Sequence, residues 1–373
     1  MIAVLDVGTT KIKIAVFDES LKIEFLDSVD VEKSVPKEYR AEQNPIEIYK
    51  KSLSLINKVK EKYPSITKLG ITNQRESFVL WNKVTGKPYY PAILWQDKRS
   101  RLFCEKLKSN KEISALVRNQ TGLIINEYFT ASKLRWLLKH LDLEATDLNN
   151  IAFGTIDSWI IYKLTGNHCT DVTNASRTML FDIRNLHWQE ELLKIFGVPK
   201  QILPKVLPSK SDFGTIKDTD MQIVGVIGDQ QASMYAAGNE IGTVKATYGT
   251  GVFVMKLLGE EFKLEKGFLT TLAVYKGENP EYLLEAKIED GSARTTPVLN
   301  NEEKLKQVVE EIATETAPTL SRLIDDNTKV VFVDGGISQN DNLVRKQQEL
   351  NNIKIERLST YEGSALGVAK LIS

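Results

Sequence analysis

An aspartate followed by a glycine turn stands early in the chain, in a pattern suited to phosphate chemistry. In Asp6–Thr10 the glycine lets backbone N–H groups approach an anion, and the two threonines add hydroxyl donors. A carboxylate at the end of a strand also suits Mg²⁺, directly or through water. Alone, such a five-residue segment is more typical of an ordinary hairpin turn.

Two further glycine turns strengthen the phosphate interpretation. Thr247–Gly251 and Asp334–Gly336 each follow a strand-like apolar run. Each alone is compatible with a plain turn. Together with Asp6–Thr10, they fit a nucleotide held between two halves of the chain, with backbone N–H groups directed at its phosphates.

Asp229 is the candidate general base. It follows the apolar run 223–227 and precedes the helix-like stretch 232–237. An aspartate at such a junction most often caps the helix. In a cleft that faces a phosphoryl donor, it would instead accept the proton of an attacking hydroxyl, as the catalytic-loop aspartate of protein kinases does.

A third group of residues suits a small polyol. Arg75 and Glu76 follow the strand-like run 68–72. Charged groups of this kind grip vicinal hydroxyls, while aromatic rings cover the C–H face and exclude water. Each aromatic side chain alone is more typical of a core. The aromatic candidates are Trp95, Tyr128 and Phe253.

These residues need a scaffold of strands and helices. Residues 2–17 predict a hairpin, and residues 45–62 predict a helix that begins at a proline. Because strands alternate with helices, we expect an α/β fold with a largely parallel sheet under helical cover. Further strand-like runs are 68–72, 77–82, 223–227, 243–247, 252–257 and 329–333.

The repeated glycine turns predict two related α/β halves that face a shared cleft. The sequence has no Pro/Gly/Ser-rich linker, so topology places the boundary near residue 235. We expect an N-terminal domain, 1–235, with the polyol site and the general base. The C-terminal domain, 236–373, would carry most of the nucleotide site.

Composition excludes several classes of protein. The 373 residues include 49 Lys+Arg and 49 Asp+Glu, and a net charge of zero argues against a nucleic-acid binder. The sequence contains no apolar stretch near the ~18 residues of a membrane span, so we expect no membrane insertion and a cytoplasmic protein. Two cysteines and three histidines predict neither a disulfide framework nor a zinc site.

The sequence resembles the FGGY carbohydrate kinases of the actin/hexokinase/Hsp70 superfamily. Residues 128–140 match the first signature of that family, an aromatic residue, then Thr, then Lys-x-x-Trp. The resemblance covers nearly all of 1–290 and resumes at about 303–373. The stretches typical of the glycerol-phosphorylating members are ITNQRES (71–77), TGKPYYPAILWQDKRS (85–100), TNASRTMLFDI (173–183), GDQQAS (228–233) and TYGTGVF (247–253).

The resemblance implies a two-lobed, ribonuclease H-like fold and ATP-dependent phosphorylation of glycerol to glycerol 3-phosphate. Asp229 would be the base, Asp6 would hold Mg²⁺, and a homodimer is left open. The implied glycerol residues are Arg75, Glu76, Trp95, Tyr128, Asp229, Gln230 and Phe253. The implied ATP residues are Thr9, Thr10, Thr250, Gly251, Gly291, Gly335, Gly336 and Asn340.

The second domain departs from the family pattern. After Glu285 the chain passes from Gly291 straight into a helix-like stretch, where Pro318 is expected to end or kink the helix. A block of the second lobe, including the second family signature, is therefore expected to be missing. Thr295 stands where the family usually has a glutamine, which bears on nucleotide affinity.

Two alternatives to glycerol phosphorylation stay open. The chain is either a kinase for another small polyol or sugar, or a non-catalytic relative that binds a polyol or nucleotide as a sensor. The surviving Asp6, Asp229 and glycine turns favour an enzyme. A chaperone or filament protein of the same superfamily is disfavoured, because neither needs the 73–76 segment and Trp95.

Overall fold

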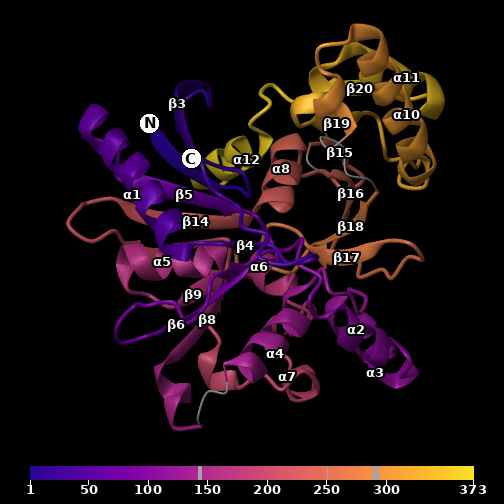
Figure 1. Ribbon diagram of the computed structural model, residues 1–373. Coiled ribbons are helices and arrows are strands. Elements are labelled where there is room, and N and C mark those ends of the chain that lie inside the picture. Colours follow the sequence, from indigo (N-terminus) through magenta and orange to yellow (C-terminus); the bar gives the residue numbers. More distant parts are fainter. Residues whose placement is uncertain (142–144, 250, 289–293) are drawn as a thin grey trace. The chain divides into compact units, whose positions relative to one another are not determined.

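A computed structural model describes residues 1–141, 145–249, 251–288 and 294–373 (Figure 1). The chain forms two compact units. The first consists of 1–229, 274–278 and 368–373, and the second of 230–273 and 279–367. The first crossing between them falls at Asp229, and two short later segments return to the first unit.

A six-stranded sheet in the order β13-β14-β5-β1-β2-β3 forms the frame of the first unit. β1 pairs in parallel with β5, and β5 pairs in parallel with β14. The other neighbours are antiparallel, beginning with the expected β1–β2 hairpin. The strands are β1 (Ile2–Val7), β2 (Lys11–Phe17), β3 (Ile23–Asp30), β5 (Lys68–Asn73), β13 (Lys210–Thr215) and β14 (Gln222–Gly228).

The side chains of this sheet alternate between its two faces, and helices pack against both faces. On one face, Leu69 and Ile71 join a core that includes α1 (Pro45–Lys62) and α5 (Ile156–Thr165). Gly70 faces the other way, where a Cβ would lie 2.2 Å from Val368 Cγ1 of α12 (Gly363–Ile372). Glycine at this position therefore lets the C-terminal helix lie directly on the sheet.

The remaining elements of the first unit surround this sheet. β4, β7, β6 and β8 form a four-stranded sheet in that order. The strands are β4 (Glu42–Gln43), β6 (Phe78–Asn82), β7 (Ala92–Ile93), β8 (Ile151–Thr155), β9 (Cys169–Asp171), β10 (Phe181–Asp182), β11 (His187–Trp188) and β12 (Lys205–Leu207). The helices are α2 (Arg101–Lys108), α3 (Lys111–Thr121), α4 (Thr130–His140), α6 (Val172–Ser176) and α7 (Glu190–Phe196), with 3₁₀ turns at Ala145–Asn150 and Lys200–Ile202.

The second unit has its own six-stranded sheet, in the order β17-β18-β16-β15-β19-β20. α10 and α11 cover one face, and α8, which begins at the unit boundary, contributes Met234 to the other. The strands are β15 (Val244–Tyr248), β16 (Val252–Gly259), β17 (Leu269–Leu272), β18 (Tyr282–Lys287), β19 (Val331–Asp334) and β20 (Ile355–Arg357). The helices are α8 (Asp229–Ala237), α10 (Glu302–Ser321) and α11 (Asp341–Asn351), with 3₁₀ turns at Thr296–Val298 and Gly336–Gln339.

Both units contain the same five-stranded arrangement. In each, three consecutive antiparallel strands lead to two parallel ones: β3-β2-β1-β5-β14 in the first unit and β18-β16-β15-β19-β20 in the second. This topology agrees with the expected pair of related α/β halves. The expected largely parallel sheet is wrong, because both sheets are mixed. Their parallel pairs are β1–β5 and β5–β14 in the first unit, and β15–β19 and β19–β20 in the second.

The sequence predicts that Pro318 ends or kinks its helix. α10 continues for three residues past Pro318, to Ser321. Pro318 stands in the last turn, and the buried Ala317 and Leu320 pack the helix end against the core on either side of it. The helix therefore continues past the proline itself and ends within the same turn.

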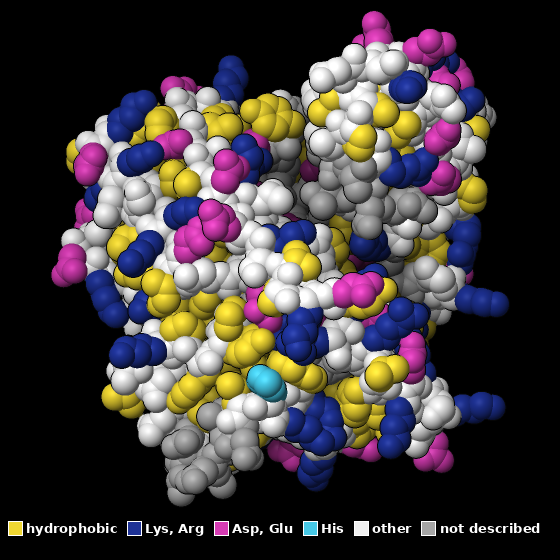
Figure 2. Space-filling model, viewed as in Figure 1, with side chains coloured by type: hydrophobic (Ala, Val, Ile, Leu, Met, Phe, Trp, Pro, Cys, Tyr) yellow, Lys and Arg dark blue, Asp and Glu magenta, His cyan; other side chains and the backbone are white. Residues whose placement is uncertain are grey.

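Two features of the structure concern nucleic-acid binding and membrane insertion, both of which the composition argues against. On the visible face of Figure 2, Lys and Arg side chains are interspersed with Asp and Glu. In the described part of the chain, no helix combines the length and apolar character needed to cross a membrane.

Candidate active site

Three parallel strands of the first unit end at the same edge of its sheet. The register sets Val7, Asn73 and Gly228 in one row across β1, β5 and β14. The residues that follow therefore leave the sheet side by side. These are the predicted Asp6–Thr10 turn, the 73–76 segment and Asp229.

A buried charged cluster lies at this edge. The side chains of Arg75 and Glu76 are 2% and 1% exposed, whereas that of Asp229 is 33% exposed. Arg75 Nε lies 3.3 Å from Asp229 Oδ1 and 3.9 Å from Glu76 Oε1. Arg177 Nε donates to Glu76 Oε1 at 2.6 Å. Two arginines thus compensate two carboxylates, and only Asp229 retains substantial exposure to solvent.

The backbone at Glu76 is strained. Its φ is +61°, a left-handed conformation that non-glycine residues adopt at a cost of about 1–3 kcal/mol. The carbonyl of Glu76 accepts a hydrogen bond from Thr130 Oγ1 at 2.9 Å. The surrounding contacts therefore hold the turn in the conformation that places Arg75 and Glu76 together.

The first glycine turn is connected to the 73–76 segment through Thr9. Thr9 Oγ1 donates to Gln74 Oε1 and accepts from Trp95 Nε1, both at 3.0 Å. Gln43 Nε2 also donates to the carbonyl of Thr9 at 2.7 Å. The Thr9 hydroxyl thus positions Trp95 and Gln74, while Thr10 is exposed beside it.

Two aromatic candidates of the first unit form one wall. The rings of Trp95 and Tyr128 meet edge to face with centroids 5.7 Å apart. Lys133 lies beneath this pair, fully buried, and its Nζ donates to the carbonyls of Tyr128 (2.8 Å), Leu94 (3.2 Å) and Trp95 (3.5 Å). Burial lowers the pKa of Lys133 to about 8. The lysine therefore joins the two loops that carry the wall.

In the second unit, the other two glycine turns are neighbours. β15 and β19 are parallel, and Thr247 stands opposite Asp334 at their carboxyl ends. Gly335 has φ +86°, and a Cβ there would lie 2.4 Å from the carbonyl oxygen of Tyr248. The close approach of the two turns therefore requires glycine at this position.

Asp334 itself is engaged within the second unit. Lys245 Nζ lies 2.8 Å from its Oδ1, and Ser233 Oγ donates to its Oδ2. Lys245 Nζ also donates to Thr247 Oγ1, which in turn donates to Gln230 Oε1 at 3.1 Å. This network fixes the ends of β15 and β19.

The structure gives the remaining predicted residues the following places. Phe253 is 8% exposed in β16 beside Gly251, where a Cβ would lie 2.7 Å from the ring. Gly336 has open space around it, and the Asn340 side chain caps α11 through the N–H of Asn342. Thr250 and Gly291 lie outside the described residues.

The donor set at the first glycine turn fits a magnesium ion carried by a nucleotide. Asp6 is partly exposed near the end of β1 and supplies carboxylate oxygens, and Thr9 and Thr10 follow in the same turn. Mg²⁺ typically binds one or two carboxylates plus substrate phosphates and water rather than an all-protein cage. Among the described residues, no group of three or more His, Cys, Asp or Glu could hold a metal ion.

Sequence reasoning missed two residues at this site. Arg177 pairs with Glu76 from a position 101 residues away, and Lys133 supports the aromatic wall. Both belong to segments that carried the family resemblance, but neither has a local pattern that indicates an ion pair or a buried ammonium group.

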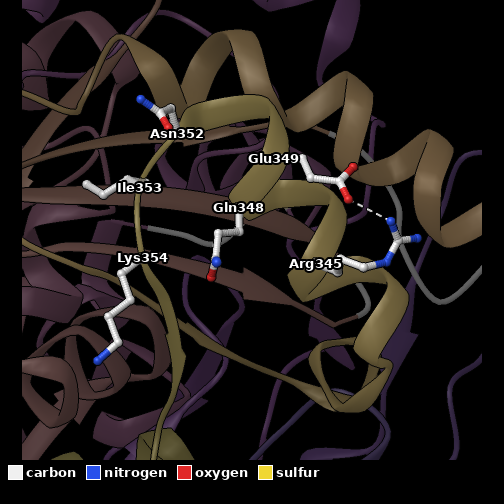
Figure 3. Close-up of a pocket in the computed structure, with 6 residues that line it drawn as sticks. All are labelled: Arg345, Gln348, Glu349, Asn352, Ile353 and Lys354. Atoms are coloured by element: carbon white, nitrogen blue, oxygen red, sulfur yellow. Dashed lines mark hydrogen bonds and ion pairs between the residues drawn. The ribbon is translucent and has the colours of Figure 1, made fainter.

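A pocket at the end of α11 is not this site. Arg345, Gln348, Glu349, Asn352, Ile353 and Lys354 line it, and Arg345 Nη1 donates to Glu349 Oε1 at 2.7 Å (Figure 3). None of the predicted site residues lines this pocket.

Comparison with known proteins shows the family to which this chain belongs. Residues 1–234 match the FGGY family of carbohydrate kinases, N-terminal domain. A glycerol kinase of Clostridium perfringens (strain 13 / Type A) is 33% identical over 443 aligned positions, which cover 99% of this chain and 88% of the relative. The chain belongs to the FGGY family of carbohydrate kinases, as its motifs predicted.

Within this family, the matched relatives include further glycerol kinases. That of Aquifex aeolicus is 39% identical over 342 residues, and that of Mycoplasma pneumoniae is 42% identical over 306. The chain spans 67% and 60%, respectively, of the lengths of these two relatives. The 443-position alignment exceeds the 373 residues of this chain, so the Clostridium relative has residues that this chain lacks.

Solved structures establish the fold. A crystal structure of Plasmodium falciparum glycerol kinase with ADP superposes with a TM-score of 0.90 at 28% identity, covering 100% of this chain and 89% of that one. A ligand-bound xylulose kinase from Lactobacillus acidophilus superposes with a TM-score of 0.85 at 17% identity. The α/β sugar-kinase fold expected from the sequence is therefore confirmed.

Proposed function

We propose that this chain phosphorylates glycerol with ATP and forms glycerol 3-phosphate. The observation that carries the proposal is the cluster of Arg75, Glu76 and Asp229 at the carboxyl edge of three parallel strands, beside the wall of Trp95 and Tyr128. The relatives named as glycerol kinases support the choice of substrate.

In this proposal, the buried charges bind the polyol. Glu76 accepts hydrogen bonds from substrate hydroxyls, and Arg75 donates to their oxygens. The aromatic wall covers the C–H face of the substrate. Gln230 and Phe253, which belong to the second unit, complete the proposed glycerol set.

Asp229 acts as the general base. The terminal hydroxyl oxygen forms a bond to the γ-phosphorus of ATP while the bond from that phosphorus to the ADP oxygen breaks. The hydroxyl proton passes to the Asp229 carboxylate, whose partial exposure leaves it accessible to the substrate. Positioned proton transfer typically contributes about 10²–10⁴-fold to a rate.

The glycine turns supply the phosphate contacts. Thr10, Thr250 and Gly251 meet the donor phosphates, and Thr9 positions the first turn. Mg²⁺ held at Asp6 would neutralise charge on the transferred group. The adenosine side is assigned to Gly291, Gly335, Gly336 and Asn340. A cleft between the lobes, a cytoplasmic location and a homodimer stay predictions.

One assay tests the proposed function. The purified chain is given Mg·ATP with and without glycerol, ADP release is followed by a coupled assay, and the product is identified by mass. We expect ADP release that depends on glycerol and a glycerol phosphate product. ATP hydrolysis that ignores glycerol contradicts the proposal. Faster turnover of a tetritol or pentulose indicates another polyol kinase, and glycerol binding without turnover indicates a sensor.

A further inference from the structure

A buried aspartate outside the proposed substrate contacts collects an unusual number of hydrogen bonds. Asp171 is fully buried and precedes α6. Its carboxylate accepts from the backbone N–H of Thr173 (3.0 Å) and of Asn174 (2.9 Å). It also accepts from Thr173 Oγ1 (2.7 Å), Asn174 Nδ2 (2.9 Å) and Ser209 Oγ (2.9 Å). A helix cap needs only the two backbone contacts, so three side-chain contacts remain to be explained.

Two of those side chains extend to the strand ends that carry the site. Thr173 Oγ1 accepts the N–H of Gly228 at 2.9 Å, and Gly228 directly precedes Asp229. The amides of Asn174 and Asn73 bond reciprocally, at 2.9 and 3.1 Å. Asn73 ends β5, whose next residues lead to Arg75. Asp171 is thereby connected to the base through one strand and to the substrate-binding arginine through another.

The direction of these bonds is fixed by chemistry. Burial raises the pKa of the Asp171 carboxyl, and the hydrogen bonds from Asn174, Thr173 and Ser209 act in the opposite direction. The single hydroxyl proton of Thr173 is donated to this carboxyl group. The hydroxyl oxygen then presents its lone pairs to the N–H of Gly228. A buried, charge-assisted chain of this kind is stronger than its separate bonds and holds its members in one geometry.

We propose that Thr173 and Asp171 are positioning residues for Asp229. They fix the end of β14 so that the base meets the substrate hydroxyl in one orientation, and neither touches the substrate. This inference rests on the proposed function, because it takes Asp229 as the base.

The test compares two substitutions at Thr173. Thr173→Val removes the hydroxyl at nearly constant volume, whereas Thr173→Ser retains it. We expect kcat to fall about 10–100-fold in Thr173→Val, with the KM for glycerol changed less than about threefold and the ATP dissociation constant unchanged. Thr173→Ser is expected to stay within about threefold of wild type.

Thr178→Val is the matched control. Thr178 is also buried in this segment, but its hydroxyl bonds locally: it donates to the carbonyl of Ala175 at 2.7 Å and accepts from the N–H of Leu180 at 3.2 Å. We expect it to lower the melting temperature without the loss of kcat. Wild-type kcat in Thr173→Val, or an equal loss in Thr178→Val, overturns the inference.

A milder variant decides the question if Thr173→Val does not fold. Ser209→Ala removes one donor from Asp171 and is expected to lower kcat about two- to fivefold with an unchanged KM; wild-type kcat there overturns the inference. If the wild-type chain does not phosphorylate glycerol, the proposed function fails and this inference with it. Wild-type turnover with an unaffected Thr173→Val removes the inference alone.

Discussion

The two units present different chemistry on the same strand arrangement. In the first unit, the ends of β5 and β14 carry paired charged side chains, such as the buried Arg75 with the partly exposed Asp229. In the second unit, the ends of β15 and β19 carry glycine turns that pack backbone against backbone at Gly335, while the nearby Asp334 is engaged by Lys245. Under the proposed function, the shared frame would serve side-chain recognition of a polyol in the first unit and main-chain recognition of phosphates in the second.

The largest expected effect comes from the charged side chains of the first unit. Arg75→Met leaves the carboxylates of Glu76 and Asp229 without one of their cations, and uncompensated buried charge costs about 2–5 kcal/mol. We expect kcat/KM for glycerol to fall by about 10²–10³ in steady-state assays, with the ATP dissociation constant unchanged. Arg101→Met, which removes an exposed ion pair with Glu105, is the control. Equal losses in both variants would show that the loss does not arise from the buried charges beside Arg75.

The next effect concerns the aromatic wall. Lys133→Met removes three hydrogen bonds to the loops of Trp95 and Tyr128. We expect the KM for glycerol to rise about tenfold, with a smaller change in kcat, because the loss of about 1.5–3 kcal/mol of charged hydrogen bonding loosens the wall rather than the base. Lys139→Met, on the exposed end of the same helix, is the control. An unchanged KM would contradict this role of Lys133.

A substitution in the second unit is expected to act on the nucleotide alone. Gly335→Ala places a Cβ against the carbonyl of Tyr248 at a positive φ. We expect the KM for ATP to rise about tenfold while the KM for glycerol stays within twofold. Gly277→Ala, which also has a positive φ but nothing within 4 Å, controls for backbone strain. A change in the glycerol KM as large as that for ATP would show that the two functions are not separated by unit.

The last expected effect is on stability rather than on activity. Burial, reinforced by the neighbouring Asp171 carboxylate, raises the pKa of Asp157 from 3.8 to about 7. The native state therefore holds a proton that the unfolded state releases between pH 4 and 7, so this group makes stability fall as the pH rises through that window.

Asp157→Asn removes this dependence. In thermal melts from pH 5 to pH 8, we expect the variant to gain stability relative to wild type as the pH rises to about 7, by at most about 3 kcal/mol. Parallel curves for the two proteins across this range would show that Asp157 is ionised in the native state at all these pH values.

The sequence predicted elements whose signals are local. Pro45 marks the start of the helix predicted over 45–62, and the observed α1 (Pro45–Lys62) has the same bounds. The β1–β2 hairpin was similarly predictable from alternation around a glycine turn. The mixed character of the sheets was not, because strand direction depends on which distant strands become neighbours.

The site was predictable where motifs are contiguous. Arg75 and Glu76 are adjacent in the chain, and both are found in the charged cluster with Asp229. Arg177 and Asp171 are brought to the same edge only by the fold, from about 100 residues away, and their burial and bonding have no local sequence signal. Long-range pairing of buried polar groups therefore limits what the sequence alone can assign.

The most direct test of the account is the glycerol-dependent rate of Asp229→Asn. The substitution keeps the shape of the side chain but removes its ability to take a proton. The account predicts that kcat falls at least about 100-fold, while ATP still binds with its wild-type dissociation constant. A variant that retains more than about a tenth of the wild-type kcat would contradict the role of Asp229 as the base.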